Sequence, residues 1–226
     1  MRIPLTKYGL PQAAVFPLII IAAMIVCLLL PAAALITAEV ILAVLLIWVL
    51  SFFRDPQRIP PAEENLLLAP ADGTIRDIEI VDENNFIGGK SLRIGIFLSI
   101  FNVHINRSPC NVKVEKIIYK KGSYKDARNP LAGTVNESND LWLIRTDEPR
   151  DKLIVRQISG AIARRIVCET EENQYLAGGE KFGMIKFGSR TELYLPQRKD
   201  ANLLVKVGDK VKAGLSPVVR YEKCQD

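Results

Sequence analysis

Residues 183–196 read GMIKFGSRTELYLP, two strand-like runs separated by the pair Gly188-Ser189. A glycine within a strand pattern usually marks a bulge or a tight turn. It also permits a backbone conformation that other residues rarely adopt, and the serine places a hydroxyl beside an unhindered carbonyl. The pair is therefore either a turn or a reactive site, and the flanking runs predict strands Gly183–Phe187 and Thr191–Leu195.

Similar short runs, rich in β-branched and aliphatic residues, extend from this stretch toward both ends of residues 54–226. The other predicted strands are Thr74–Val81, Leu92–Leu98, Asn111–Tyr119, Leu141–Arg145, Lys152–Ile158, Leu203–Val207 and Pro217–Tyr221. Their spacing is typical of an all-β sandwich or barrel with few short helices. Only Ser159–Ile166 is expected to form a helical turn, with strand as the alternative. Residues 54–226 are thus predicted to form one β domain that buries its own core.

The first 53 residues have a different composition, because their only charged side chains are Arg2, Lys7 and Glu39. They contain two apolar blocks, Ala13–Leu30 and Ala33–Phe53, each long enough to span a bilayer. A cleaved signal would have one such block, so residues 1–53 are predicted to form a retained α-helical membrane hairpin.

Basic residues flank the hairpin, with Arg2 and Lys7 before it and Arg54 and Arg58 after it. The positive-inside rule then places both ends, and the β domain, on the cytoplasmic face of the cell membrane. Arg54 and Arg58 would also favour anionic lipid. A shallow re-entrant hairpin or an interfacial helix pair remains an alternative, because Glu39 is costly at mid-bilayer.

The composition excludes several classes of protein. Hydrophobic residues make up 49% of the chain, which excludes a disordered tail. The net charge of +5 comes without basic stripes or interleaved aromatics, so no nucleic-acid partner is expected. One histidine and no Cys-x-x-Cys pattern argue against a metal site, and the four cysteines are expected to stay reduced in a cytoplasmic domain.

His104 is the only histidine, so any imidazole chemistry must use it. A serine nucleophile needs a base, and a base needs a group that orients it. Ser189, His104 and Asp72 are therefore candidate nucleophile, base and orienting carboxylate. A structural histidine and a turn-forming aspartate are the alternative interpretations of these residues.

Six ordered motifs between residues 52 and 196 resemble those of the phosphatidylserine decarboxylase proenzymes, in particular their short single-domain class. They are FFRDPQRIP (52–60), PADG (70–73), NVHINRSP (102–109), NESN (136–139), QISGAIARRI (157–166) and FGS (187–189). The N-terminal hydrophobic segment fits the same family.

The resemblance implies a zymogen that cleaves itself between Gly188 and Ser189. The Ser189 hydroxyl would attack the Gly188 carbonyl, with His104 as base and Asp72 fixing the imidazole tautomer. Elimination and hydrolysis would leave a pyruvoyl cofactor, derived from Ser189, on the small chain, and residues 1–188 would form the large chain. The two chains would remain partners in one fold, and a homodimer is left open.

The same resemblance implies the reaction. The pyruvoyl carbonyl derived from Ser189 would form a Schiff base with the amine of phosphatidylserine, a membrane phospholipid, and serve as electron sink for its decarboxylation to phosphatidylethanolamine and CO2. Candidate substrate-binding residues are Asn136, Glu137, Arg107 and Lys186. For the two basic residues the alternative is a solvated charge on a strand face.

Two positions depart from the family pattern. Longer relatives carry a second histidine, implicated in decarboxylation, where this chain has Phe101, so the proton donor could be His104, water or a lipid group. Ser138 stands where the family has arginine, which weakens a headgroup role for that loop.

Two other classes of protein compete with this interpretation. A membrane-anchored serine hydrolase would use Ser189, His104 and Asp72 without cleaving its own chain. A non-enzymatic β module of the lipoyl-carrier type would need an exposed lysine in its modification turn, and no such lysine is evident. A cleaved chain carrying a carbonyl separates the proenzyme from both alternatives.

Overall fold

The computed structural model describes residues 5–129, 132–161, 165–186 and 188–222. Arg2, Phe187, residues 162–164 and Cys224, on which some predictions rest, lie outside these ranges. The chain divides into two compact units, Met1–Gln57 and Arg58–Asp226.

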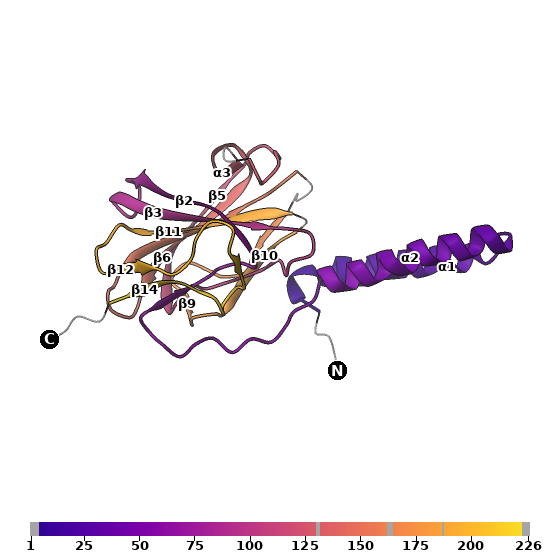
Figure 1. Ribbon diagram of the computed structural model, residues 1–226, viewed down its shortest axis with the longest axis horizontal. Coiled ribbons are helices and arrows are strands. Elements are labelled where there is room, and N and C mark those ends of the chain that lie inside the picture. Colours follow the sequence, from indigo (N-terminus) through magenta and orange to yellow (C-terminus); the bar gives the residue numbers. More distant parts are fainter. Residues whose placement is uncertain (1–4, 130–131, 162–164, 187, 223–226) are drawn as a thin grey trace. The chain divides into compact units, whose positions relative to one another are not determined.

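The first unit is a pair of apolar helices (Figure 1). A single 3-10 turn, η1 (Lys7–Gly9), leads into α1 (Leu10–Cys27), and α2 is Ala32–Phe52. Pro11 lies in the first turn of α1, where a missing backbone N–H costs nothing. The ends of the hairpin are tied together, since the Thr6 N–H donates to the Phe53 carbonyl at 2.9 Å. Both helical stretches are long and apolar enough to cross a membrane.

The second unit is built almost entirely from strands, so the prediction of an all-β domain is confirmed. The strands are β1 (Leu66–Leu68), β2 (Gly73–Glu83), β3 (Gly89–Leu98), β4 (Ile105–Arg107), β5 (Val112–Lys120), β6 (Ser138–Arg145), β7 (Lys152–Ile158), β8 (Ile166–Cys168), β9 (Tyr175–Leu176), β10 (Lys181–Ile185), β11 (Ser189–Pro196), β12 (Ala201–Leu203), β13 (Lys210–Val211) and β14 (Pro217–Tyr221). The helical exception among the described residues is the single turn α3 (Ala132–Val135).

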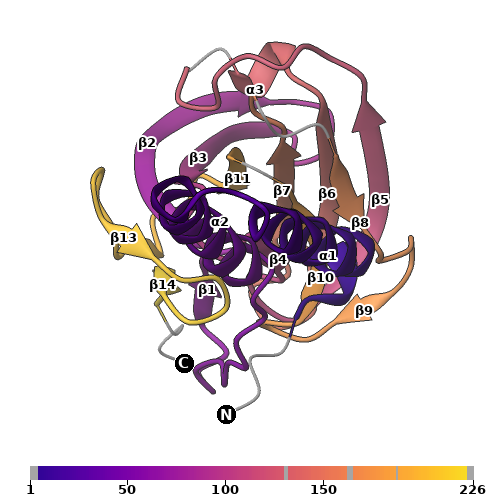
Figure 2. The same cartoon turned by 90° about the vertical axis from the view of Figure 1, so that its right-hand side faces the viewer.

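The strands form one large sheet and two small ones. The eight-stranded sheet has the order β13-β2-β3-β11-β7-β6-β5-β9, and the small sheets are β1-β14-β12 and β4-β10-β8. Figure 2 shows β2, β3, β11, β7, β6 and β5 following one another around a curve. Fully buried aliphatic side chains from these strands, among them Ile96, Leu143, Val155 and Leu193, form the core.

Strand β11 lies inside the large sheet, with antiparallel partners on both sides. Ser189 pairs with Leu98 of β3, and Arg190 pairs with Ile158 of β7. Because side chains alternate along a strand, Ser189 faces the same side as Leu193 and Leu195 of the core. The hydroxyl of Ser189 is therefore held at the core side of a central strand.

The opposite face of β11 carries buried charges. The Arg190 guanidinium binds both carboxylate oxygens of Asp77 on β2, at 2.6 and 2.7 Å, and Glu192 at 2.8 Å. To reach Asp77 it crosses β3 at Gly95, where a Cβ would lie 2.2 Å from Arg190 Nη2. These contacts fit one register only, since a one-residue slip would turn the charged side chains of β11 into the core.

Most predicted strands are present, and β7 and β14 have the predicted ends. The strand predicted at Leu203–Val207 is wrong, because β12 ends at Leu203 and residues 204–206 are irregular. Leu203, Leu204 and Val207 are exposed and Val205 alone of this run packs against the core, so the run lacks the alternating burial of a strand. In the segment Ser159–Ile166, Ile166 begins β8, while residues 162–164 lie outside the description.

Truncation of a core side chain on β11 should destabilise the large sheet. Leu193→Ala removes a fully buried side chain and is expected to lower the free energy of unfolding by about 2–5 kcal/mol. Ile80→Ala, at a side chain that is 55% exposed on β2, should cost less than about 1 kcal/mol. Urea unfolding of the full-length protein in detergent measures both, and equal losses would contradict the placement of Leu193.

Candidate active site

Gly188 and Ser189 form the junction between β10 and β11. Gly188 has φ of +67°, in the left-handed region where side chains are strained. The glycine therefore lets the chain turn into the sheet immediately before Ser189. Ser189 itself is fully buried, and its Oγ has no hydrogen-bond partner in the described part of the structure. A buried hydroxyl of this kind calls for an explanation, and catalytic function is one.

His104 lies against this junction. It follows β3 by a short loop, which the Asn102 side chain closes by accepting bonds from the Ser99 N–H and hydroxyl at 2.9 and 2.8 Å. The imidazole is fully buried, and its Nε2 accepts a 3.2 Å bond from the Gly188 N–H. An accepting Nε2 carries no proton, so Nδ1 donates to the Asn102 carbonyl at 2.9 Å. The basic nitrogen of His104 is thus aimed at the Gly188-Ser189 junction.

Asp72 is placed differently from the sequence-based expectation. Its two oxygens accept bonds from the Arg58 guanidinium at 2.5 and 2.8 Å, and the Ala213 N–H adds a third at 2.8 Å. The structure thus brings His104 to Gly188, next to Ser189, but pairs Asp72 with Arg58, while the Asn102 carbonyl holds the imidazole. The Arg58 side chain is only 6% exposed, and its charge is paired with that of Asp72.

Gly160 contacts the Gly188 carbonyl group. A Cβ at position 160 would lie 2.1 Å from the Gly188 oxygen, so only glycine allows this approach. The preceding residue, Ser159, is held by Asn136, whose Nδ2 donates to its carbonyl at 2.8 Å, and by the Glu137 carbonyl, which accepts from its N–H at 2.9 Å. Gly160 lies in the motif QISGAIARRI (157–166), but the sequence pattern alone assigns it no separate role.

The four predicted substrate-binding residues are all buried. Asn136 also bonds the backbone of Lys125, and Glu137 accepts from the Tyr119 hydroxyl at 2.6 Å, which raises the pKa of Tyr119 to about 12. Arg107 donates to the Gly179 carbonyl at 3.0 Å. Burial, and next the charge of Arg165, lowers the pKa of Lys186.

A cavity of about 410 Å³ reaches Gly188. Its lining is mostly apolar, with one carboxylate and one guanidinium: Phe97, Ser99, Ile100, Asp126, Ala127, Arg128, Ala161 and Gly188. None of the four predicted substrate-binding residues belongs to this lining. Sequence reasoning missed the cavity because separate loops build it and no motif marks Asp126 or Arg128.

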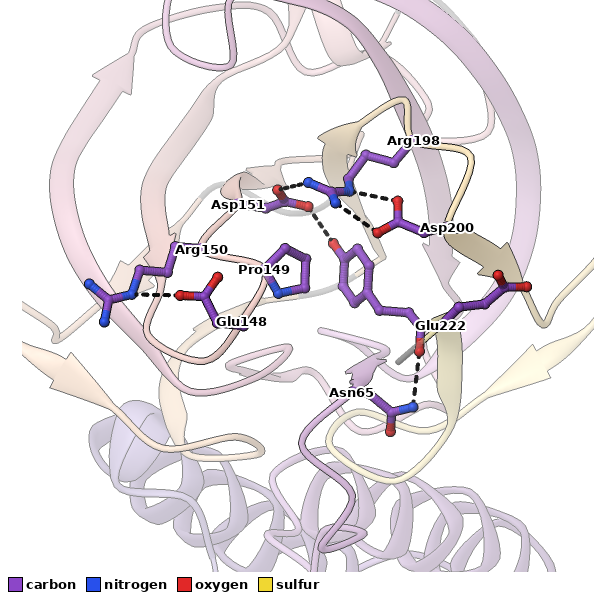
Figure 3. A pocket seen from close by; sticks show the side chains of 9 residues that line it. Asn65, Glu148, Pro149, Arg150, Asp151, Arg198, Asp200 and Glu222 are labelled. Atoms are coloured by element: carbon purple, nitrogen blue, oxygen red, sulfur yellow. Dashed lines mark hydrogen bonds and ion pairs between the residues drawn. The ribbon is translucent and has the colours of Figure 1, made fainter. Parts of the chain in front are cut away.

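A larger cavity, about 680 Å³, has no part in this junction (Figure 3). Charged side chains dominate its wall, and they largely satisfy one another. Arg198 binds Asp151 at 3.1 Å and Asp200 at 2.7 Å, and Asp151 also accepts from the Tyr221 hydroxyl. Neither Gly188 nor Ser189 is among the residues that line this larger cavity.

The sequence of this chain is similar to those of known proteins. The family model for phosphatidylserine decarboxylase matches residues 45–218. A phosphatidylserine decarboxylase proenzyme of Desulfotalea psychrophila is 46% identical over 165 residues, which cover 73% of this chain and 75% of the relative. Proteins of the same name from Nitrosomonas eutropha and Pelagibacter ubique are 46% and 44% identical, covering 73% and 76% of this chain and 74% and 79% of their own lengths.

Substitution of Gly160 tests whether the position of the Gly188 carbonyl controls reactivity at Ser189. Gly160→Ala should displace that carbonyl and slow chain cleavage roughly 10- to 100-fold, the size of effect that a misplacement of about 1 Å produces. Gly178→Ala is a matched control, because its Cβ would meet atoms no closer than 3.4 Å. Gel electrophoresis of the full chain over time follows both, and normal cleavage of Gly160→Ala in a folded protein would refute the role.

Proposed function

Because this chain belongs to the phosphatidylserine decarboxylase family, we propose that it is made as a proenzyme that cleaves itself between Gly188 and Ser189. The enzyme is a carboxy-lyase that converts phosphatidylserine to phosphatidylethanolamine and CO2. The observation that carries the proposed cleavage is the 3.2 Å bond between His104 Nε2 and the Gly188 N–H. It puts the only imidazole of the chain at the peptide group directly before the bond proposed to break.

In the proposed cleavage, His104 Nε2 releases the Gly188 N–H and removes the proton of the Ser189 hydroxyl as Oγ attacks the Gly188 carbonyl. The imidazolium then returns the proton to the leaving nitrogen of Ser189, which leaves an ester between Gly188 and Oγ. Loss of the Ser189 α-proton breaks the Cβ–Oγ bond and releases Gly188 as a carboxylate. Hydrolysis of the resulting enamine releases ammonia and leaves a pyruvoyl terminus at position 189.

The surroundings of Ser189 fit such a group. Its hydroxyl is buried without a partner in the described residues, so no structural hydrogen bond is lost when it reacts. The group, once formed, supplies the electron sink for decarboxylation. Strand β11 holds it in place through β3 and β7 on either side. His104, already at this site, is the proposed proton donor where longer relatives have the histidine that this chain replaces with Phe101.

Strand pairing holds the two proposed chains together after cleavage. Residues 189–226 contribute β11 to the large sheet, β13 as the partner of β2, and β14 as the partner of β1. These pairings are noncovalent and do not involve the Gly188-Ser189 bond. The large and small chains therefore remain one fold.

We propose that the helices of the first unit anchor the enzyme where its lipid substrate is found. Their 21-residue stretches have mean hydropathies of 2.3 and 2.6, and large side chains such as Leu18, Val26, Ile36 and Ile47 are exposed. An exposed apolar surface of this kind is matched by hydrocarbon rather than by water. With Lys7 before the helices and Arg54 after them, the proposed location of the second unit is the cytoplasmic face.

The primary test is replacement of Ser189. Ser189→Ala removes the nucleophile and should leave one uncleaved, inactive chain. Wild type should give a fragment of residues 189–226 about 17 Da lighter than one with a free serine terminus, the difference that a pyruvoyl group makes. Intact mass spectrometry reads both.

Ser91→Ala is the matched control for that test. Ser91 is also a fully buried serine of the large sheet, but its hydroxyl bonds the Gly89 carbonyl. It should be cleaved as wild type is. An uncleaved but folded wild-type chain would favour the serine hydrolase instead.

A second test separates the roles of His104 and Asp72. For Asp72 to orient the imidazole, His104 Nδ1 would have to leave the Asn102 carbonyl and donate to the Asp72 carboxylate, which in the structure binds Arg58 and the Ala213 N–H instead. His104→Gln should abolish cleavage, and Asp72→Asn should slow it by at least about tenfold. Arg58→Gln, which removes only the counter-ion, should slow it less. Equal slowing by Asp72→Asn and Arg58→Gln, measured by cleavage rate in folded protein, would make the pair a structural clamp only.

A further inference from the structure

We propose that Arg128 binds the phosphodiester of the substrate headgroup in the cavity that reaches Gly188, a role that rests on the proposed function. The substrate brings three charges to this cavity: a phosphate, an ammonium and a carboxylate. The lining offers one guanidinium, that of Arg128, and one carboxylate, that of Asp126. Arg128 could bind either of the two anionic groups of the lipid, the phosphate or the carboxylate.

The Asp126 carboxylate fixes the orientation of the Arg128 guanidinium. Its Nε and Nη2 donate to the Asp126 carboxylate at distances between 2.6 and 3.1 Å. Asp126 also accepts from the Arg128 backbone N–H at 2.9 Å, so both ends of the arginine are fixed. The described bonds leave the two N–H groups of Nη1 for a ligand. The side chain is 66% exposed, which allows a lipid headgroup to reach it.

The chemistry of decarboxylation assigns the phosphate, not the carboxylate, to Arg128. Loss of CO2 moves the carboxylate charge away, so an arginine bound to that carboxylate would stabilise the ground state more than the transition state. A phosphodiester keeps its charge throughout the reaction. Binding it holds the substrate equally in both states and opposes no step.

The rest of the cavity is mostly apolar, which favours loss of the substrate carboxylate as CO2. Phe97, Ile100, Ala127 and Ala161 give it an apolar wall next to Gly188. An apolar environment favours loss of a charge that would be well solvated in water. The cavity thus combines a cationic group for the phosphate with an apolar region for the reacting carboxylate.

The kinetic test is Arg128→Gln in the full-length, cleaved enzyme assayed in mixed micelles of phosphatidylserine and detergent. Removal of one charge-assisted contact should raise KM roughly tenfold and leave kcat within about twofold. Arg128→Lys, which keeps the charge, should recover part of the loss. Arg150→Gln is the matched control, because Arg150 is an exposed arginine paired with the carboxylate two residues before it, Glu148, in the other cavity (Figure 3).

A binding measurement tests the same contact without catalytic turnover. Glycerophosphoethanolamine has the phosphate without the carboxylate, and serine has the carboxylate without the phosphate. Equilibrium dialysis should show that Arg128→Gln weakens binding of glycerophosphoethanolamine roughly tenfold and leaves serine unchanged. Failure of the proposed function would appear separately, as an uncleaved wild-type chain.

Two outcomes would overturn the assignment. If Arg128→Gln and Arg150→Gln both match wild type in KM and in dialysis, Arg128 is only a surface ion pair. If Arg128→Gln lowers kcat and weakens serine instead, the arginine acts on the carboxylate.

Discussion

The pairing of β11 between β3 and β7 is the constraint on which the site depends. It fixes Ser189 opposite Leu98, the last residue of β3, and the short loop after β3 then carries His104 back to Gly188. The proposed nucleophile and the proposed base are therefore positioned by the same strand pair. Gly188 completes the arrangement, because its left-handed backbone turns the chain into the sheet directly before Ser189. A shift of β11 by one residue would separate these groups and turn the serine away from the core face.

The buried charges on the other face of β11 are best understood through this need for one register. A buried ion pair contributes little net stability, because desolvation offsets most of the attraction. Arg190 nevertheless reaches Asp77 only across Gly95 of β3, and Glu192 binds both Arg190 and the Tyr194 hydroxyl. In these positions the charges penalise alternative registers. The strand that carries Ser189 is therefore held in register by its charged side chains as well as by its backbone pairing.

Sequence patterns predicted the regular parts of the molecule and selected Gly188, Ser189 and His104 as candidates, but they did not predict the parts made by distant loops. The strands β7 and β14 were predicted to the residue because their apolar patterns are continuous, while β4 and β8, with three residues each, are too short for a period to emerge. Gly188, Ser189 and His104 could be selected because a lone histidine leaves no other base. The Arg58 partner of Asp72 and the Arg128 cavity could not, because both depend on how loops meet in three dimensions. The prediction of a strand at Leu203–Val207 failed because an apolar run alone does not show how many of its side chains the core covers.

The strand order also determines when the chemistry can begin during biosynthesis. Every partner that β11 needs is synthesised before it, whereas β1, near the start of the second unit, waits for β14 near the end of the chain. The large sheet can therefore take up β11 between β3 and β7 before β14 exists, while the small sheet closes last. The proposed cleavage at Ser189 depends on the large sheet alone, so the appearance of two chains would report that this sheet has formed and not that the whole domain has.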